Sequence, residues 1–170
     1  MHRLHLLRHA KSSWDEGVDD RDRKLNRRGR DEAERIGAHL PGAIGALDLV
    51  LCSTARRARE TMVPVLTGFT PAPRLVVEDG LYLAGAVALL NRLSQLDEDD
   101  GAVLLIGHNP GLHELAVTLA ATDSPGYPEL AGGKFPTAVR ASFAIVGPWS
   151  TLGRTRHRLV DYVTAKSLKA

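Results

Sequence analysis

The sequence contains little cysteine, few aromatic residues and no long hydrophobic run. Its one cysteine, Cys52, cannot form an internal disulfide, and we interpret it as a small buried hydrophobic side chain. Low cysteine use is typical of a reducing compartment, so we expect a cytoplasmic protein. No stretch approaches the ~18 apolar residues of a membrane span, and no apolar signal segment precedes the first expected strand. The sequence therefore predicts neither membrane association nor a secretory leader.

The net charge is only +2, and aromatic residues make up 5% of the chain. Nucleic-acid binding would need a larger basic excess or stacked aromatic side chains, so nucleic acid is not an expected partner. The 7 histidines include no metal-ligand spacing, because His113-Glu114 is not followed by a second histidine four residues after His113. We therefore expect neither a metal site nor a cofactor.

The chain does contain a regular alternation of apolar runs and amphipathic segments over 170 residues, 44% of them hydrophobic. This fits one domain, residues 1–170, with a sizeable core. Apolar runs predict buried strands at 4–7, 47–53 and 102–106 and a short strand at 75–77, and two further strands, 138–146 and 157–163, are expected at an edge. The segments between them predict helices from Asn26 to Pro41-Gly42, from a cap at Ser53 or Thr54 to Leu66, at 86–96 and at 112–121, with a loop at 122–136. This alternation indicates a three-layer α/β/α sandwich with a mostly parallel sheet.

Three of the expected strands run directly into polar residues of similar chemistry. The first ends in Arg8-His9, the second in Ser53 to Ala58 with two arginines, and the fourth in Gly107-His108-Asn109. Because the carboxyl ends of neighbouring parallel strands meet at one edge of a sheet, these residues should line one pocket. We expect that pocket to contain two histidines and at least two arginines, without a carboxylate to neutralise them. A cationic cleft of this kind suits a phosphoryl group.

The order and content of these motifs resemble the histidine phosphatase superfamily, whose fold is phosphoglycerate mutase-like, and within it the SixA-type phosphohistidine phosphatases. Four motifs in register carry the resemblance, with a weaker fifth at 135–138: LRHAKSSW (7–14), DRDRKLNRRG (20–29), STARRARET (53–61) and GHNPGL (107–112). Two positions depart from the pattern. Lys24 stands where this branch usually has proline, and Ala10 where the superfamily motif has glycine.

The resemblance implies a role for each matched residue. His9 would be the nucleophile that accepts the phosphoryl group, which is chemically reasonable for a neutral imidazole whose second nitrogen donates to a fixed acceptor. The transferring oxygens would be held by four side chains, Arg8, Arg23, Arg57 and His108. Arg57 is preferred over its neighbours Arg56 and Arg59 because it directly precedes the alanine of the motif. The protonation state of His108 stays open, since a helix N-terminus opposes its charge and a bound phosphate favours it.

The proton donor to the leaving group is not decided by the sequence. Larger members of the superfamily use a glutamate after the third strand, which places Glu78 or Asp79 in that region. Asp20, close to the loop arginines, is a third candidate, and each of these residues could equally be an ordinary surface carboxylate.

The resemblance implies a phosphatase that works through a covalent phosphohistidine intermediate. The expected partner is a protein that carries phosphohistidine, because we expect the chain to lack the insertions with which larger members enclose small metabolites. A phosphomonoesterase of small phosphate esters is the main alternative, and a superfamily mutase is disfavoured by the same lack of insertions. A non-catalytic phosphate-binding module is a further alternative, which the presence of both His9 and His108 disfavours.

Overall fold

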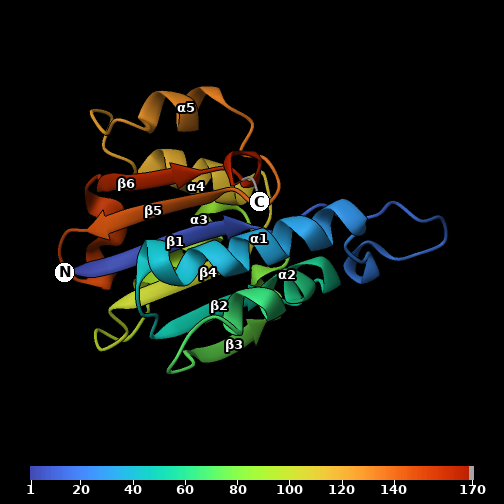
Figure 1. Ribbon diagram of the computed structural model, residues 1–170. Helices are drawn as coiled ribbons and strands as arrows, with labels where there is room; N and C mark the ends of the chain where they lie inside the picture. The colour runs from blue at the N-terminus through green and yellow to red at the C-terminus, as the bar shows by residue number, and fades with distance from the viewer. Residues whose placement is uncertain (169–170) are drawn as a thin grey trace.

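The computed structural model describes residues 1–168 and contains a six-stranded sheet with helices on both faces (Figure 1). The strands lie in the order β3-β2-β4-β1-β5-β6. Their bounds are β1 His2–Arg8, β2 Leu49–Ser53, β3 Arg74–Glu78, β4 Ala102–Gly107, β5 Arg140–Ile145 and β6 Arg158–Val163. The helices are α1 Arg27–Ile44, α2 Arg56–Leu66, α3 Ala86–Ser94, α4 Gly111–Leu119 and α5 Tyr127–Gly132, and short 3-10 helices include Asp20–Asp22 and Asp79–Leu81.

The sheet is mostly parallel, as the sequence predicts. β1 pairs in parallel with β4, and β2 pairs in parallel with both β3 and β4. β5 runs antiparallel to β1, and β6 runs antiparallel to β5. The last two strands therefore form one side of the sheet, which confirms the expected α/β class and the edge position of β6.

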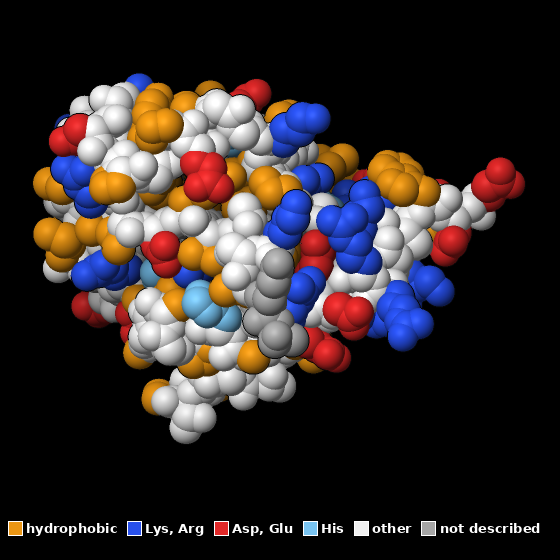
Figure 2. Space-filling view, turned by 45° about the horizontal axis from the view of Figure 1, so that its top comes forward, with side chains coloured by type: hydrophobic (Ala, Val, Ile, Leu, Met, Phe, Trp, Pro, Cys, Tyr) orange, Lys and Arg blue, Asp and Glu red, His pale blue; other side chains and the backbone are white. Residues whose placement is uncertain are grey.

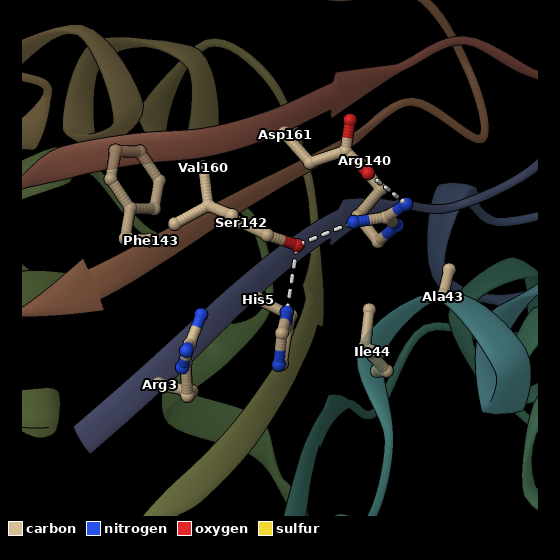
Figure 3. A pocket seen from close by; sticks show the side chains of 9 residues that line it. All are labelled: Arg3, His5, Ala43, Ile44, Arg140, Ser142, Phe143, Val160 and Asp161. Atoms are coloured by element: carbon tan, nitrogen blue, oxygen red, sulfur yellow. Dashed lines mark hydrogen bonds and ion pairs between the residues drawn. The ribbon is translucent and has the colours of Figure 1, made fainter. Parts of the chain in front are cut away.

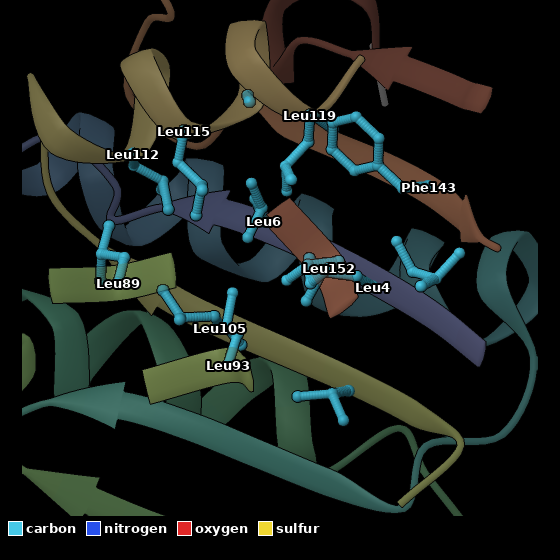
Figure 4. Packing of buried hydrophobic residues seen from close by; sticks show 14 of the residues in the cluster. Leu4, Leu6, Leu89, Leu93, Leu105, Leu112, Leu115, Leu119, Phe143 and Leu152 are labelled. Carbon is cyan, nitrogen blue, oxygen red and sulfur yellow. The ribbon is translucent and has the colours of Figure 1, made fainter. Parts of the chain in front are cut away.

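Alternation of side chains along β1 separates two hydrophobic cores. Leu4 and Leu6 point to one face, where α3 and α4 pack over them (Figure 4). Leu7 points to the opposite face, which is covered by α1 and α2. Each fully buried leucine stabilises the fold by about 1.5–3 kcal/mol relative to an exposed one, so both helical layers are held on the sheet mainly by burial. No helix of residues 1–168 has the length and apolar character needed to cross a bilayer.

Helix α1 continues past the predicted stop at Pro41-Gly42 and ends at Ile44. Pro41 lacks one donor, but its carbonyl still accepts a hydrogen bond from the Gly45 N–H at 3.2 Å. Gly45 has a φ of +72°, a backbone conformation that glycine adopts without the steric cost of a Cβ atom. The operative stop signal is therefore Gly45, and the prediction at Pro41-Gly42 was wrong.

Two further local predictions are corrected by the structure. Segment 122–136 contains helix α5, because Pro128 lies in its first turn, where the missing N–H costs nothing, and Leu130 is buried in the core. The N-cap of α2 is Ala55, without a side-chain cap, and neither Ser53 nor Thr54 fills that role. The Ser53 hydroxyl instead accepts from the Ala55 N–H at 3.2 Å, within the turn that leads from β2 into the helix.

Candidate active site

The three motif-bearing strands are neighbours, in the order β2-β4-β1, and their carboxyl ends lie at one edge of the sheet. Arg8 at the end of β1 is in register with Gly107 at the end of β4. A cavity of about 260 Å³ opens there, lined by Arg8, His9, Lys11, Ser12, Trp14, Asp20, Arg23, Arg57, Leu83, His108, Asn109 and Thr137. The structure thus brings together His9, Arg8, Arg23, Arg57 and His108, all of which the sequence places at the site.

His9 is held as a neutral imidazole with one nitrogen available for chemistry. Its Nδ1 lies 2.8 Å from the Ala10 carbonyl oxygen, which can only accept, so the ring proton is on Nδ1 and Nε2 keeps its lone pair. Burial lowers the pKa of His9 to about 3, with the nearby His108, Arg8 and Arg57 acting in the same direction against the opposing hydrogen bond to Ala10. The side chain therefore has the tautomer and charge state that a nucleophile requires.

Arg8 and the backbone around it are fixed by the segment that precedes β5. The Arg8 guanidinium donates to the Phe135 carbonyl at 3.1 Å, and the Ala138 N–H lies 3.0 and 3.1 Å from the carbonyls of Arg8 and His9. Phe135 and Ala138 have positive φ values of 51° and 60°. Leu83, which lines the cavity, has a φ of 49°. Such backbone costs about 1–3 kcal/mol per residue and is concentrated at functional sites, in agreement with its position here.

Arg57, the second residue of α2, points inward and is 2% exposed. Its Nη1 donates to the Asp20 carbonyl at 2.6 Å, and its Nη2 donates to Asp20 Oδ2 at 3.0 Å. The neighbouring arginines point outward: Arg56 pairs with Glu60, and Arg59 donates to the Thr54 carbonyl on the surface. Of the cluster at 56–59, only Arg57 lines the cavity.

His108 lies opposite His9, with 5.2 Å between the ring centroids. Its Nδ1 is 3.4 Å from Arg57 Nη2, a donor, and its Nε2 is 2.7 Å from Ser53 Oγ. The Nδ1 nitrogen therefore accepts, and the ring proton lies on Nε2. Burial and the charge of Arg57 lower the pKa of His108 to about 4, so the side chain is neutral at pH 7 in the ligand-free protein.

Asp20 corrects the expectation of a pocket without a carboxylate. It lies on the segment between β1 and α1 that projects beyond the sheet (Figure 1), and its carboxylate accepts from Arg57, Arg23 and Tyr82. Burial opposes ionisation of Asp20, but these hydrogen bonds outweigh it and lower the pKa to about 2. The sequence does not reveal this, because the intervening segment is long and carries several acidic residues that look alike.

The other two candidate proton donors do not line the cavity. Glu78 accepts from Arg92 Nε at 2.9 Å, and Asp79 accepts from the Thr54 hydroxyl at 2.7 Å and from Arg21 on the protein surface. Of the three carboxylates considered from sequence, only Asp20 faces the cavity.

Arg23 and Trp14 form one wall of the cavity. Arg23 donates to Ser12 Oγ at 2.6 Å and to Asp20 Oδ1 at 3.0 Å, and its guanidinium carbon lies 3.6 Å from the centroid of the Trp14 ring. Trp14 is nonetheless 75% exposed, which leaves its other face to solvent. Figure 2 shows Lys and Arg side chains gathered toward this end of the molecule, with Asp and Glu among them.

Several cavity-lining residues were not predicted individually from the sequence. They are Lys11, Ser12, Trp14, Leu83, Asn109 and Thr137. Five of them stand within or beside the quoted motifs, so motif membership was an available signal. No sequence signal pointed to Leu83, because its positive φ follows from the tertiary structure.

The chain is similar to known proteins in both sequence and fold. A family model for the histidine phosphatase superfamily (branch 1) matches residues 4–81. An uncharacterized protein of Mycobacterium tuberculosis is 35% identical over 147 residues, which cover 85% of this chain and 90% of that protein. A structure from Agrobacterium tumefaciens, assigned as the phosphohistidine phosphatase SixA, has a TM-score of 0.81 at 30% identity and covers 96% of this chain and 97% of its own. A second, from Nakamurella multipartitia with the same assignment, has a TM-score of 0.83 at 27% identity, with coverages of 96% and 95%.

The six-stranded sheet, its two helical layers and the cationic cavity are those of a phosphatase with a phosphoglycerate mutase-like fold of the α/β class. The chain belongs to the histidine phosphatase superfamily, in its SixA-type branch.

Proposed function

We propose that this phosphatase removes the phosphoryl group from phosphohistidine on another protein, through a phosphohistidine formed on its own His9. His9 Nε2 attacks phosphorus in line, the phosphorus–nitrogen bond of the substrate breaks, and the substrate imidazole leaves. Water then attacks the phosphorylated His9, the new phosphorus–Nε2 bond breaks, and inorganic phosphate departs with His9 neutral again. The backbone acceptor at Ala10 supports this role, because it keeps Nε2 unprotonated.

The side chains around His9 match the charge of a transferring phosphoryl group. Arg8, Arg57 and Arg23 provide three guanidinium groups, and His108 adds a ring whose pKa rises when a dianion binds beside it. Phosphoryl transfer passes through a loose transition state with charge spread over three oxygens, so positioned donors account for most of the catalysis. Asp20 holds Arg57 and Arg23 in the ligand-free protein, and an entering phosphoryl group competes with it for their donors.

One observation supports phosphohistidine over phosphate esters. Asp20 is the only carboxyl group among the cavity-lining residues, and with a pKa of about 2 it carries no proton at pH 7. A serine or sugar alkoxide needs a proton as its bond breaks, and such general acid catalysis contributes about 10²–10⁴ in rate. An imidazole whose second nitrogen is protonated leaves as a neutral molecule without it, since its pKa is near ~6.5.

The test is a comparison of kcat/KM for a phosphohistidine protein, a phosphoserine peptide, a sugar phosphate and an aryl phosphate. We expect the phosphohistidine protein to exceed the phosphoserine peptide and the sugar phosphate by at least ~10-fold, which corresponds to ~1.4 kcal/mol. The aryl phosphate should also turn over, because its leaving group is a weak base. A sugar phosphate or nucleotide that is better by the same margin would establish the small-molecule alternative. Tight binding without turnover of any of them would indicate a phosphate-binding module.

The intermediate is tested with phosphorus-labelled substrate and a rapid alkaline quench, which preserves phosphohistidine. The label should map to His9 and disappear, with nearly all activity, in His9→Asn. His2→Asn is the matched control, because His2 lies at the opposite end of β1 and pairs with Glu98. Label on Ser53 or Cys52 would contradict the mechanism.

A further inference from the structure

A second polar cavity, of about 140 Å³, lies beside the carboxyl end of α1 and against β1, β5 and β6 (Figure 3). It shares no lining residue with the active-site cavity. Arg3 and His5 reach it from β1, and Arg140 and Ser142 from β5. Since side chains alternate along a strand, His5 is on the face opposite Leu4 and Leu6, the side that α1 covers.

Buried side chains at this cavity form a connected network. Arg140 is 0% exposed and donates to Ser142 Oγ at 2.6 Å and to Asp161 Oδ2 at 2.9 Å. His5 Nδ1 lies 2.7 Å from the same Ser142 oxygen (Figure 3). Because the guanidinium is a donor, the serine hydroxyl is free to donate its own proton to Nδ1, which places the His5 proton on Nε2. His5 Nε2 and Arg140 Nε are buried without a hydrogen-bond partner.

The electrostatic balance of the cavity is positive. Asp161 offsets one arginine, but Arg3 forms no ion pair with any residue of the described range 1–168. Burial, together with the smaller effects of the Arg140 and Arg3 charges, lowers the pKa of His5 to about 4. Asp161 therefore does not cancel the positive potential that His5 experiences.

This network is costly for a purely structural element of a sheet. A buried guanidinium and imidazole lose their hydration, and apolar side chains at positions 5, 140 and 142 would pack the same face without that loss. The β5–β6 register also shifts between Ser142 and Phe143, where the cavity lies. Bulges of this kind often redirect side chains near binding sites.

We propose that this cavity is a binding site for one small oxyanion of the phosphate type, with Arg3 and Arg140 as the charged groups that hold it. The volume suits a five-atom anion and is well below the ~300–1,000 Å³ of pockets for drug-sized ligands. Charge-assisted hydrogen bonds from guanidinium groups are the standard recognition of such anions. Ser142, which is itself hydrogen-bonded to His5, accepts from Arg140 on one side, and Asp161 accepts on the other. The site lies outside the catalytic machinery, so its occupancy is independent of the proposed substrate.

The experiment uses the full chain labelled with ¹⁵N-histidine and follows each imidazole by NMR during titration with inorganic phosphate. The active site also binds phosphate, and the resonances of His9 and His108 report it separately from that of His5. Glycerol 3-phosphate is titrated in parallel, to distinguish free phosphate from a phosphate group on a larger molecule. We expect a saturable shift of the His5 resonances, with a midpoint different from that of His9.

Arg3→Gln is the informative variant, because Arg3 is exposed and its loss should not prevent folding. The variant should weaken the His5 response at least ~10-fold while leaving the His9 response and kcat/KM unchanged. Arg158→Gln is the matched control, since it removes the same charge from an exposed position on β6 that pairs with Asp123. A His5 resonance that does not move, or that drifts equally in both variants without saturation, would show that the network is structural only.

Discussion

Arg57→Ala should abolish most of the phosphatase activity, whereas Arg56→Ala and Arg59→Ala should not. The three arginines lie in one helix turn of α2, yet only Arg57 is buried at the cavity, with Nη1 and Nη2 directed at Asp20 and His108. Replacing one charged donor to transition-state oxygens typically reduces the rate ~10²–10³-fold, or ~2.7–4 kcal/mol. Arg56 forms an exposed pair with Glu60, and such pairs contribute only ~0.3–0.5 kcal/mol to stability and nothing to the site.

The assay is kcat/KM with an aryl phosphate for the three variants, together with thermal unfolding of each. Arg57→Lys should recover only part of the loss, because a lysine provides one charged group in place of a planar fork with several donors. A second measurement is the pKa of His108 by NMR. The charge of Arg57 lowers that pKa, so Arg57→Ala should raise it toward its ordinary value of 6.5. Equal rate losses at all three positions, with folded variants, would refute the assignment of Arg57.

Three further predictions concern pH and metal ions. For an aryl phosphate, kcat/KM corrected for substrate ionisation should stay flat from about pH 7 to pH 5, because burial lowers the pKa of His9 to about 3 and that of His108 to about 4. A single ionisation near pH 6.5 that removes activity would contradict this. His5 is protonated more easily in the unfolded chain than in the folded one, so its contribution to stability, on the order of 3 kcal/mol, is present above pH 6.5 and is lost as the pH falls through about 4. His5→Gln should therefore make the unfolding free energy less steep between those pH values than in the unmodified protein, and an unchanged slope would count against the burial argument. Exhaustive chelation should leave the activity intact, since guanidinium groups supply the positive charge at the phosphoryl group; a loss restored by one divalent ion would show the opposite.

The sequence was most informative where chemistry follows directly from a strand end. β1, β2 and β4 are short apolar runs, so the positions of Arg8, Ser53 and Gly107 at their ends were predictable. The strand order of the sheet then places these ends side by side. The choice of Arg57 depended on the family motif, since helical periodicity alone leaves three arginines within one helical turn as candidates.

The sequence was least informative where tertiary contacts determine the position or the backbone conformation of a residue. Asp20 lies on a long segment without periodicity, and its hydrogen bonds to Arg57 and Tyr82 join residues 37 and 62 positions apart. Leu83 and Ala138 have positive φ values that no local pattern predicts for these residue types. At Pro41 a local signal predicted a helix end that the structure does not have. The proline is tolerated in the last turn of α1, and the helix is capped only at Gly45.

The hydrogen bond from His9 Nδ1 to the Ala10 carbonyl has a consequence for how this site tolerates mutation. The acceptor belongs to the main chain, so no single side-chain replacement can delete it, unlike a carboxylate that orients a catalytic histidine in other enzymes. Position 10 can exchange glycine for alanine and keep the tautomer of the nucleophile, provided that the residue stays small enough for its fully buried place beside Thr61. The tautomer of His9 is therefore independent of the side chains around it, so substitutions at the rim of the pocket leave Nε2 as the attacking nitrogen.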